Sequence, residues 1–479
     1  MSETKLLKNT IYYSIGEILP RVISFLLLPI YTQYLSPTDY GIISYTSTII
    51  VFLYVLGAFA LNSYVLRFYF IHTKENEQRE IIGTAQLVIV GLNLMILAIA
   101  FVLMPPIIER YQIQVPWNPF FRYAFIINFL DSLSIIPMVI YRVRQDAIKF
   151  VLLGFTRTLL TVLLTIYLVV YLNRGLIGTY QANLYVLIPY SFIYIYIIQR
   201  YGRWRINWSY IKEALYFCAP LIPGAICYQL LSVSDRVILE RNVGIDSLGI
   251  YNIACQMALV LNIVIQSGYK AIEPELFRRY EKEGFYDFIR KIKSVFFFVI
   301  YIGALVLCLF SQEVFHIMTS DAFHEGYLLV PALVVGVVMT GQNVIYGGIL
   351  QAEKRTKVIG TATVIGAILS ISVNIVLVPL FGTYAAAFAS ALSFFLMNTV
   401  LYLKMTFPGK SMWRELLLII LIPILAYLVF HFNTSICVYS ITIKLIAIVL
   451  YAYFASLLLR VDTNFVKKYI NTKYNTNIK

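Results

Sequence analysis

Long apolar runs recur along almost the whole chain and limit its fold more than any other feature of the sequence. A transmembrane helix needs roughly 20 apolar residues, whereas a strand of a membrane barrel needs only about 9 to 11. Because the runs are continuous and too long for such strands, we predict an all-α integral membrane protein with about 14 transmembrane helices. The predicted spans cover residues 11–34, 41–66, 81–104, 121–140, 149–172, 179–199, 214–239, 248–269, 294–315, 326–350, 358–379, 382–403, 415–432 and 438–459.

The composition excludes most other classes of protein. Of the 479 residues, 60% are hydrophobic and 13% are charged, which excludes an ordinary soluble enzyme, a coiled coil and a disordered chain. The longest polar connection, at residues 267–293, is either an amphipathic interfacial helix or a solvated connector. It is too short for a catalytic domain, so we expect no enzyme. The five cysteines lie in apolar runs without CxxC spacing, so we expect neither a metal site nor a cofactor.

Lysine and arginine are distributed unevenly between the two sides of the predicted bundle. With the N-terminus inside, 30 of them fall in connections on one side, and three, Arg110, Arg174 and Arg241, on the other. Cytoplasmic connections carry such an excess, so we predict that both termini are cytoplasmic. The net charge of +14 then reflects topology and attraction to anionic membrane lipids, and we expect no nucleic acid as a partner. The first apolar run contains Glu17 and Arg21, unlike a cleavable signal peptide, and is predicted to be a retained span.

Similar residues recur at a nearly constant distance along the chain. Three pairs of matching positions lie six spans apart, at offsets of 204 or 208 residues: Gly178 and Gly382, Gly41 and Gly249, and Lys149 and Lys357. An offset of six spans predicts two parallel six-helix lobes, a plan of secondary transporters in which the substrate binds between the lobes. We predict an N-lobe at residues 1–200, a C-lobe at residues 201–407, and two further helices with a cytoplasmic tail at residues 408–479.

Charged residues inside the spans are candidates for function, because an unpaired charge in the bilayer is expensive. Glu17 and Arg21 lie one helical turn apart in the first span, where Arg21 is suited to bind an anion and Glu17 to bind a coupling ion. A structural ion pair is the alternative for these two residues. Asp131, in the middle of the fourth span, is either an ion-coupling carboxylate or the structural partner of Arg157 on the next span.

The remaining charges lie nearer the ends of the predicted spans. Asp235 and Arg236, in the seventh span, are either a gate or a pair that reaches the interface, and Lys444 is expected to reach the interface. Arg122 adds to an excess of cations over acids inside the spans, five to three. Guanidinium groups match phosphate geometry, so this excess predicts an anionic substrate. The candidates are therefore Arg21, Arg157, Arg122 and Arg236 for substrate binding, and Glu17, Asp131 and Asp235 for ion coupling.

Two stretches of the sequence carry a family resemblance. Residues 23–31, ISFLLLPIY, and 35–41, LSPTDYG, look like the first helix and the following loop of a known transporter family. That family is the polysaccharide-transporter branch of the multidrug/oligosaccharidyl-lipid/polysaccharide exporter superfamily. Asn374, together with residues 378–386, VPLFGTYAA, is similar to its junction between helices eleven and twelve.

The resemblance implies a flippase, similar to O-antigen flippases, that moves an undecaprenyl-diphosphate-linked oligosaccharide across the inner (cytoplasmic) membrane. It implies a cation-lined cavity between two lobes and alternating access coupled to H⁺ or Na⁺. A polysaccharide polymerase and a chain-length regulator would be further partners. In related lipid-linked precursor flippases the last two helices form a groove for the lipid tail, a role that residues 415–459 would inherit by position only.

Two other functions are alternatives. A drug or cation antiporter of the same superfamily would favour an acid-rich cavity, whereas cations outnumber acids inside these spans. A membrane polymerase of the same pathway would handle the same lipid. Such a polymerase usually needs a large outer loop, and the predicted outward connections do not much exceed about 20 residues.

Overall fold

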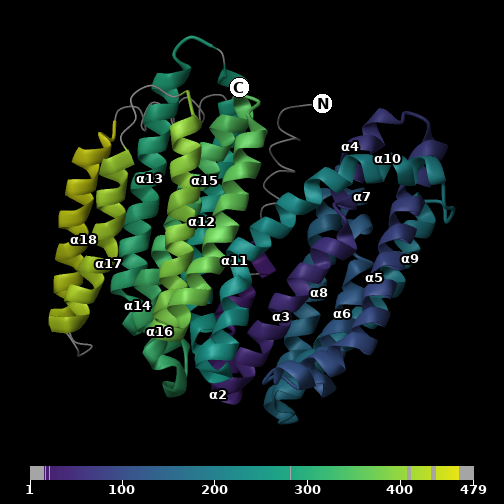
Figure 1. Cartoon of the computed structure of the whole chain (residues 1–479), viewed down its shortest axis with the longest axis horizontal. Helices are drawn as coiled ribbons and strands as arrows, with labels where there is room; N and C mark the ends of the chain where they lie inside the picture. Colours follow the sequence, from purple (N-terminus) through teal and green to yellow (C-terminus); the bar gives the residue numbers. More distant parts are fainter. Residues whose placement is uncertain are drawn as a thin grey trace. The chain divides into compact units, whose positions relative to one another are not determined.

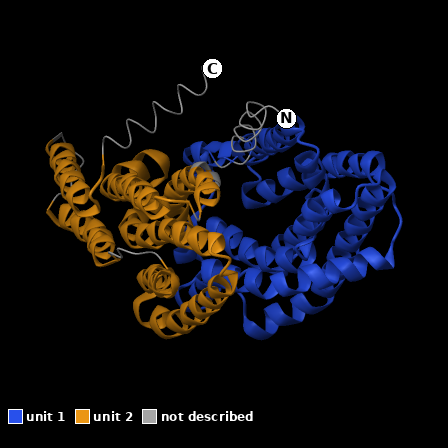
Figure 2. Ribbon diagram, turned by 90° about the horizontal axis from the view of Figure 1, so that it is seen from above, with its two compact units in different colours: residues 1–249 blue, residues 250–479 orange. Residues whose placement is uncertain are grey.

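A computed structural model describes residues 16, 18–20, 22–280, 282–406, 412–432 and 438–462 (Figure 1). Within these ranges the chain is almost entirely helical and forms no strand. The chain divides into two compact units, unit 1 at residues Met1–Gly249 and unit 2 at residues Ile250–Lys479 (Figure 2). The predicted division at residues 200 and 407 rests on the sequence repeat and stays a prediction.

Twelve segments of the described residues are long and apolar enough to cross a membrane. Eleven of them match one predicted span each, and the segment Thr356–Lys404 covers two predicted spans. The backbone of that segment is not helical at Gly382, where φ is 61°, so it is two helices joined at a kink. The first predicted span, at residues 11–34, lies partly outside the described residues. The prediction of an all-α membrane protein is confirmed, and these two causes explain the difference in count.

Unit 1 contains several membrane spans that are broken into two helices. Its helices are α2 (Leu28–Tyr34), α3 (Pro37–Ala58), α4 (Leu61–Ile71), α5 (Glu75–Tyr111), α6 (Arg122–Ser132), α7 (Ile135–Val143), α8 (Ala147–Ile166), α9 (Gly175–Tyr201), α10 (Trp208–Cys218) and α11 (Ile222–Val243). Phe59 and Ala60, both with positive φ, separate α3 from α4. A turn at residues 133–134 separates α6 from α7, and the 3₁₀ turn Ala219–Leu221 separates α10 from α11. Such breaks need other partners for the freed backbone groups, so they occur where protein or a cavity surrounds them.

The core of unit 1 lies where α4, α5, α7 and α9 meet. It is built from aliphatic and aromatic side chains, among them Leu61, Ile81, Ile136 and Tyr194. The short helix α10 joins this core through Ala214, Phe217 and Cys218, and it contacts α4 and α5. The core thus fixes α7, α8 and α9 relative to one another around the polar site described below.

Unit 2 is a second helical bundle. Its helices are α12 (Ile245–Arg279, which begins in unit 1), α13 (Phe285–Leu309), α14 (Ser311–Met318), α15 (Val330–Ala352), α16 (Thr356–Lys404), α17 (Met412–Phe432) and α18 (Val438–Leu459). α15 packs along α16, and α13 contacts α15, α17 and α18. The two helices beyond the sequence repeat, α17 and α18, both pack against α13, and α17 also packs against α15.

Candidate functional site

A polar pocket of about 330 Å³ lies in unit 1. It is bounded by Pro20 and Ser24, by the start of α7, and by α8 and α9. Hydroxyl, amide and guanidinium groups at the depth of apolar helices are uncommon and typically mark a functional site. The polar residues of its wall include Ser24, Ser134, Arg157, Thr158, Asn183 and Tyr194.

Arg157 and Asp131 form an ion pair beside this pocket. Nη1 of Arg157 lies 2.6 Å from Oδ1 of Asp131, and the two side chains are 25% and 38% exposed. The hydroxyl of Tyr194, which is buried, also interacts with the guanidinium. The structure therefore shows the pairing of Asp131 with Arg157 that was one of the two predicted alternatives. The pair is neutral overall, yet a guanidinium has five N–H donors and can serve a ligand as well.

The local sequence explains how the helices hold this pair. Asp131 lies in the last turn of α6, and the hydroxyl of Ser134 donates to its carbonyl oxygen at 2.7 Å, where the chain turns into α7. On α8, the hydroxyls of Thr158 and Thr161 each donate to the carbonyl oxygen four residues earlier, at 3.0 Å. Each hydroxyl oxygen still has lone pairs that can accept a bond from a ligand. The hydroxyls of Ser134, Thr158 and Thr161 are thus bonded within their own helices and turn, and each can still accept a bond from a ligand.

Of the other predicted site residues, the three that the structure describes, Arg122, Asp235 and Arg236, do not line this pocket. Glu17 and Arg21 lie outside the described residues. Arg122 is exposed at the start of α6. Asp235 and Arg236 are neighbours on α11, where Nη1 of Arg236 lies 3.5 Å from Oδ1 of Asp235 and both side chains are largely buried. Asp131 and Arg157 are brought together by the fold, and the roles proposed for all seven residues stay predictions.

Two buried ion pairs in unit 2 are absent from the predicted site residues. Nζ of Lys293 on α13 lies 2.7 Å from Oε1 of Glu415 on α17, whose side chain is 1% exposed. The hydroxyl of Tyr346 on α15 donates to the other oxygen of Glu415 at 2.5 Å. Lys444 on α18 is also fully buried and pairs with Glu313 on α14, whereas the sequence suggested that it reaches the interface. These pairs join α17 and α18 to the rest of unit 2.

The first turns of α3 and α12 approach each other closely within unit 1. A Cβ atom added to Gly41 would overlap the carbonyl oxygen of Ile245, and one added to Gly249 would overlap the carbonyl oxygen of Pro37. The contact is reciprocal. Gly41 faces Ile245 and Gly249 faces Pro37. The two glycines are 208 residues apart, and so are Pro37 and Ile245. We refer to residues 37–41 and 245–249 as the glycine contact.

The capping of α3 prepares this contact. Oγ of Ser36 accepts a bond from the backbone N–H of Asp39, and the Asp39 carboxylate accepts one from the N–H of Ser36 at 2.9 Å. This capping box starts the helix at Pro37. The side chain of Thr38 takes no part in the box and instead belongs to the glycine contact. Oγ1 of Thr38 donates to Oδ1 of Asp246 at 2.5 Å, again between residues 208 apart. Residues 36–39, SPTD, therefore cap the start of α3 and also supply a hydrogen bond to the start of α12.

An apolar groove of about 850 Å³ lies in unit 2, between α15, the second half of α16, and α17. Aliphatic and aromatic side chains line it, including Met339, Phe388, Phe395, Leu417 and Ile420. A groove of this size and chemistry accommodates an alkyl or polyprenyl chain.

The sequence of residues 6–278 matches a family described as "Polysaccharide biosynthesis protein". The chain belongs to this family. A relative from Haemophilus influenzae, Lsg locus putative protein 1, is 22% identical over 318 residues, which are 65% of this chain and 76% of the relative. The segment that matches the family contains the polar pocket and the glycine contact, whereas the apolar groove and the buried ion pairs of unit 2 lie beyond it.

Two solved transporter structures share the fold. The lipid II flippase MurJ, in an inward closed conformation, aligns with a TM-score of 0.74 and 14% identity over 94% of this chain and 99% of its own. An inward-facing multidrug resistance MATE family transporter of the MOP superfamily aligns with a TM-score of 0.64 and 12% identity, over 86% and 98%. At such identities the likeness concerns the fold. This family member is therefore a multi-pass membrane protein with a transporter fold.

Proposed function

We propose that the chain is a flippase that moves an undecaprenyl-diphosphate-linked oligosaccharide, a repeat unit of O-antigen or a related surface polysaccharide, from the cytoplasmic to the outer leaflet of the inner membrane. Membership of a polysaccharide biosynthesis family supports the substrate class, and the transporter fold supports movement of that substrate. The observation that carries the proposal is the polar pocket with Arg157 in its wall, inside the segment that matches the family. The orientation with both termini cytoplasmic is part of the proposal.

The pocket binds one portion of the head group. Its volume of about 330 Å³ is near the lower end of the range for ligand pockets, so it holds a phosphate or one sugar rather than the whole repeat unit. Arg157 supplies charge-assisted hydrogen bonds to an anionic oxygen, and Ser134, Thr158 and Asn183 supply neutral ones. When a ligand takes up the guanidinium, Asp131 loses its partner and binds a proton or a cation, which couples transport to an ion gradient.

The other predicted residues and the groove extend this proposal. Arg21, Arg122 and Arg236 add positive charge along the path of the head group, and Glu17 and Asp235 are further ion-coupling carboxylates. The lipid tail stays in the bilayer and lies against the apolar groove of unit 2. The glycine contact closes the outer end in one state and opens in the other, as alternating access requires. Movement follows only if the ligand binds the two states with different affinities.

The test is complementation of a strain that lacks the gene, with the leaflet position of lipid-linked repeat units as the readout. Arg157→Ala and Asp131→Asn are compared with wild type at equal membrane levels, and Arg110→Ala, an exposed arginine near the end of α5, is the matched control. We expect units trapped in the cytoplasmic leaflet in the deletion strain and the Arg157→Ala strain, and normal transfer with Arg110→Ala. Arg21→Ala and Glu17→Gln extend the series to the first span.

Other outcomes would support the alternative functions. Units that reach the outer leaflet of the deletion strain but stay unpolymerised would point to a polymerase. Normal surface glycan with increased drug sensitivity would point to an antiporter, a function that other proteins of this fold have. Either result overturns the flippase proposal and the roles given to Arg157 and Asp131.

A further inference from the structure

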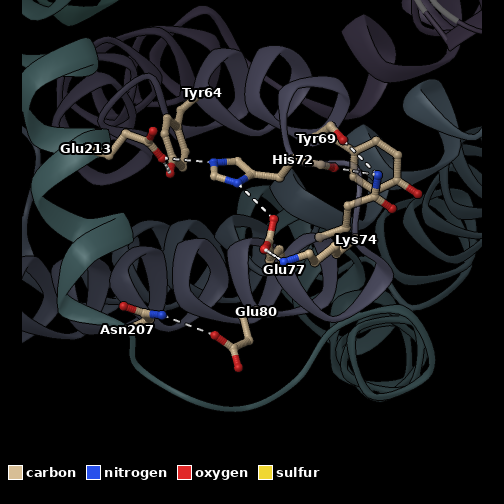
Figure 3. A network of polar contacts seen from close by, with 9 residues as sticks. Tyr64, Tyr69, His72, Lys74, Glu77, Glu80, Asn207 and Glu213 are labelled. Atoms are coloured by element: carbon tan, nitrogen blue, oxygen red, sulfur yellow. Dashed lines mark hydrogen bonds and ion pairs between the residues drawn. The ribbon is translucent and has the colours of Figure 1, made fainter.

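His72 lies between two carboxylates at the end of unit 1 where α4 ends and α5 begins (Figure 3). Its Nδ1 lies 3.3 Å from Oε2 of Glu77 on α5, and its Nε2 lies 3.5 Å from Oε2 of Glu213 on α10. The side chain is 22% exposed, and the Nε2 atom is shielded from solvent without completing a hydrogen bond to any described residue. We refer to His72, Glu77 and Glu213 as the histidine cluster.

The arrangement of the ring fits its protonated form. A neutral imidazole has one N–H donor and one nitrogen that only accepts, whereas the imidazolium donates from both nitrogens. With carboxylate oxygens facing both nitrogens, a neutral His72 would turn a lone pair toward one of two negative charges. Histidine is also the side chain whose charge ordinarily changes between about pH 5 and 8. The cluster therefore gains a favourable contact when it binds a proton.

Each of the two carboxylates also has a partner other than His72. Lys74 pairs with Glu77 at 3.5 Å, and the hydroxyl of Tyr64 donates to Oε2 of Glu213 at 2.7 Å. With His72 neutral, Glu77 keeps the ammonium of Lys74 and Glu213 keeps the hydroxyl of Tyr64, and a proton on His72 adds a cation between the two carboxylates. The titratable and charged groups that face the ring or its two partners are Tyr64 and Arg67 from α4, Lys74, Glu77 and Glu80 from the start of α5, and Tyr210 and Glu213 from α10.

The cluster joins α10 to α4 at a point where α10 has few other polar links. The start of α10 is held to α5 by uncharged donors: Nδ2 of Asn207 donates to Glu80 at 3.1 Å, and its backbone N–H donates to Thr84 at 3.3 Å. Further along, Glu213 connects α10 to His72 and to Tyr64. In a bilayer an apolar helix face gains little by leaving lipid for protein, so polar contacts of this kind have a large share in helix docking.

We propose that His72 is a proton-binding residue whose positive charge keeps α10 docked on α4, and that loss of the proton lets α10 move away about its start at Asn207. Because α10 continues through the turn Ala219–Leu221 into α11, and α11 packs on α3, this movement changes the bend of the seventh span. Proton binding and docking do not depend on the substrate. Their use in the transport cycle rests on the proposed function, in which a cytoplasmic proton would favour one state of the transporter.

The test measures docking directly in the purified full chain in lipid nanodiscs. Spin labels are placed at Tyr216→Cys on α10 and Phe70→Cys on α4, both strongly exposed, after replacement of the five native cysteines. Distances are compared at about pH 5.5 and about pH 8.5, on either side of the range in which histidine changes charge. We expect the ratio of the docked to the displaced population to fall by up to about fivefold on raising the pH, as for a partly exposed ion pair of ordinary strength.

Two variants and one control identify the residue responsible. His72→Gln should give the same ratio at both pH values, and Glu213→Gln should remove most of the pH response if His72→Gln does not fold. His324→Gln is the matched control, because His324 also lies 3.5 Å from a carboxylate, that of Asp321, with a similar exposure of 24%. A pH-independent ratio in the wild type, or an unchanged pH response in His72→Gln, overturns the proposal.

The flippase proposal fails independently of this one. A chain whose distances respond to pH through His72 but that moves no lipid-linked units would retain the proton site and overturn the proposed function. A chain that moves such units with equal distances at both pH values would do the reverse.

Discussion

The two ends of unit 1 are held together in different ways. At one end, the glycine contact brings two backbones together so closely that no Cβ atom fits at Gly41 or Gly249, and its polar link is a single hydrogen bond from Thr38 to Asp246. At the other end, the histidine cluster places two carboxylates 3.3 to 3.5 Å from the ring nitrogens of His72, among partly exposed side chains, and the proposed protonated ring joins them through opposite charges. The first contact depends on the close fit of two backbones, and the second depends on charge. They should therefore respond to opposite kinds of perturbation.

This difference has a consequence for a transporter that alternates between two states. A contact that depends on close backbone approach is either fully made or lost, because interiors of this packing density do not deform gradually. A contact between partly exposed charges changes in strength with pH and salt, so the proportion of molecules in which it is made shifts gradually. If the predicted orientation and the two proposals hold, shape closes the outer end, and protons adjust the cytoplasmic end.

The largest effect is expected from a side chain inserted into the glycine contact. Gly41→Leu places carbon atoms where the Ile245 carbonyl lies, and overpacking of this kind costs about 1–3 kcal/mol or more. We expect transport to fall by about tenfold or more, to the same extent at every pH, because each 1.4 kcal/mol is a factor of ten in an equilibrium.

The control for this variant is Gly91→Leu on α5, where an added Cβ atom would have nothing within 4 Å. Leaflet transfer at equal membrane levels measures both. Equal transfer by the two variants would contradict the assignment of the contact as limited by shape.

For these two regions, the sequence predicted the helices and the repeat better than the contacts between the helices. Gly41 and Gly249 stood out because the same residue recurs at an offset of 208, which served to predict the two lobes and not a contact between the two positions. The sequence did not indicate what each glycine approaches, because five other spans separate α3 from the start of α12 along the chain. His72 and Glu77 are near in sequence, whereas Glu213 joins them from 141 residues away.

The candidate site was predicted in part for a similar reason. The Asp131–Arg157 pair could be proposed because the two residues lie on consecutive spans, where facing positions are limited. Lys293 and Glu415 were not singled out, since each lies at the edge of a predicted span, where a charge normally reaches water or lipid head groups. Their burial depends on the packing of α17 against α13, which no local pattern of the sequence encodes.

A second prediction, with an effect of intermediate size, concerns two glutamates that have similar partners and differ in burial. Glu415 is bound by Lys293 and the hydroxyl of Tyr346 and is 1% exposed, whereas Glu213 has His72 and the hydroxyl of Tyr64 and is 34% exposed.

Removing one partner of a buried ion pair costs about 3–5 kcal/mol, whereas an exposed pair contributes at most about 1 kcal/mol. Glu415→Gln should therefore lower the thermal unfolding temperature in detergent clearly, and Glu213→Gln should change it little while it alters the pH response of α10. Similar unfolding temperatures for the two variants would mean that burial does not separate a structural pair from an adjustable one in this chain.

The smallest effect is expected from removal of the charge at the glycine contact. In Asp246→Asn the side-chain oxygen still accepts the hydrogen bond from Thr38, and the backbone approach of Gly41 to Ile245 is unchanged. Because a neutral acceptor replaces a charged one, the loss is that of a hydrogen bond weakened by about half, less than about 1 kcal/mol. Transport should fall by no more than about fivefold, without any new dependence on pH. Asp246→Ala, which removes the acceptor, should have the greater effect of the two. If Asp246→Asn were as damaging as Gly41→Leu, charge rather than shape would hold this end together, and the contrast with the histidine cluster would be lost.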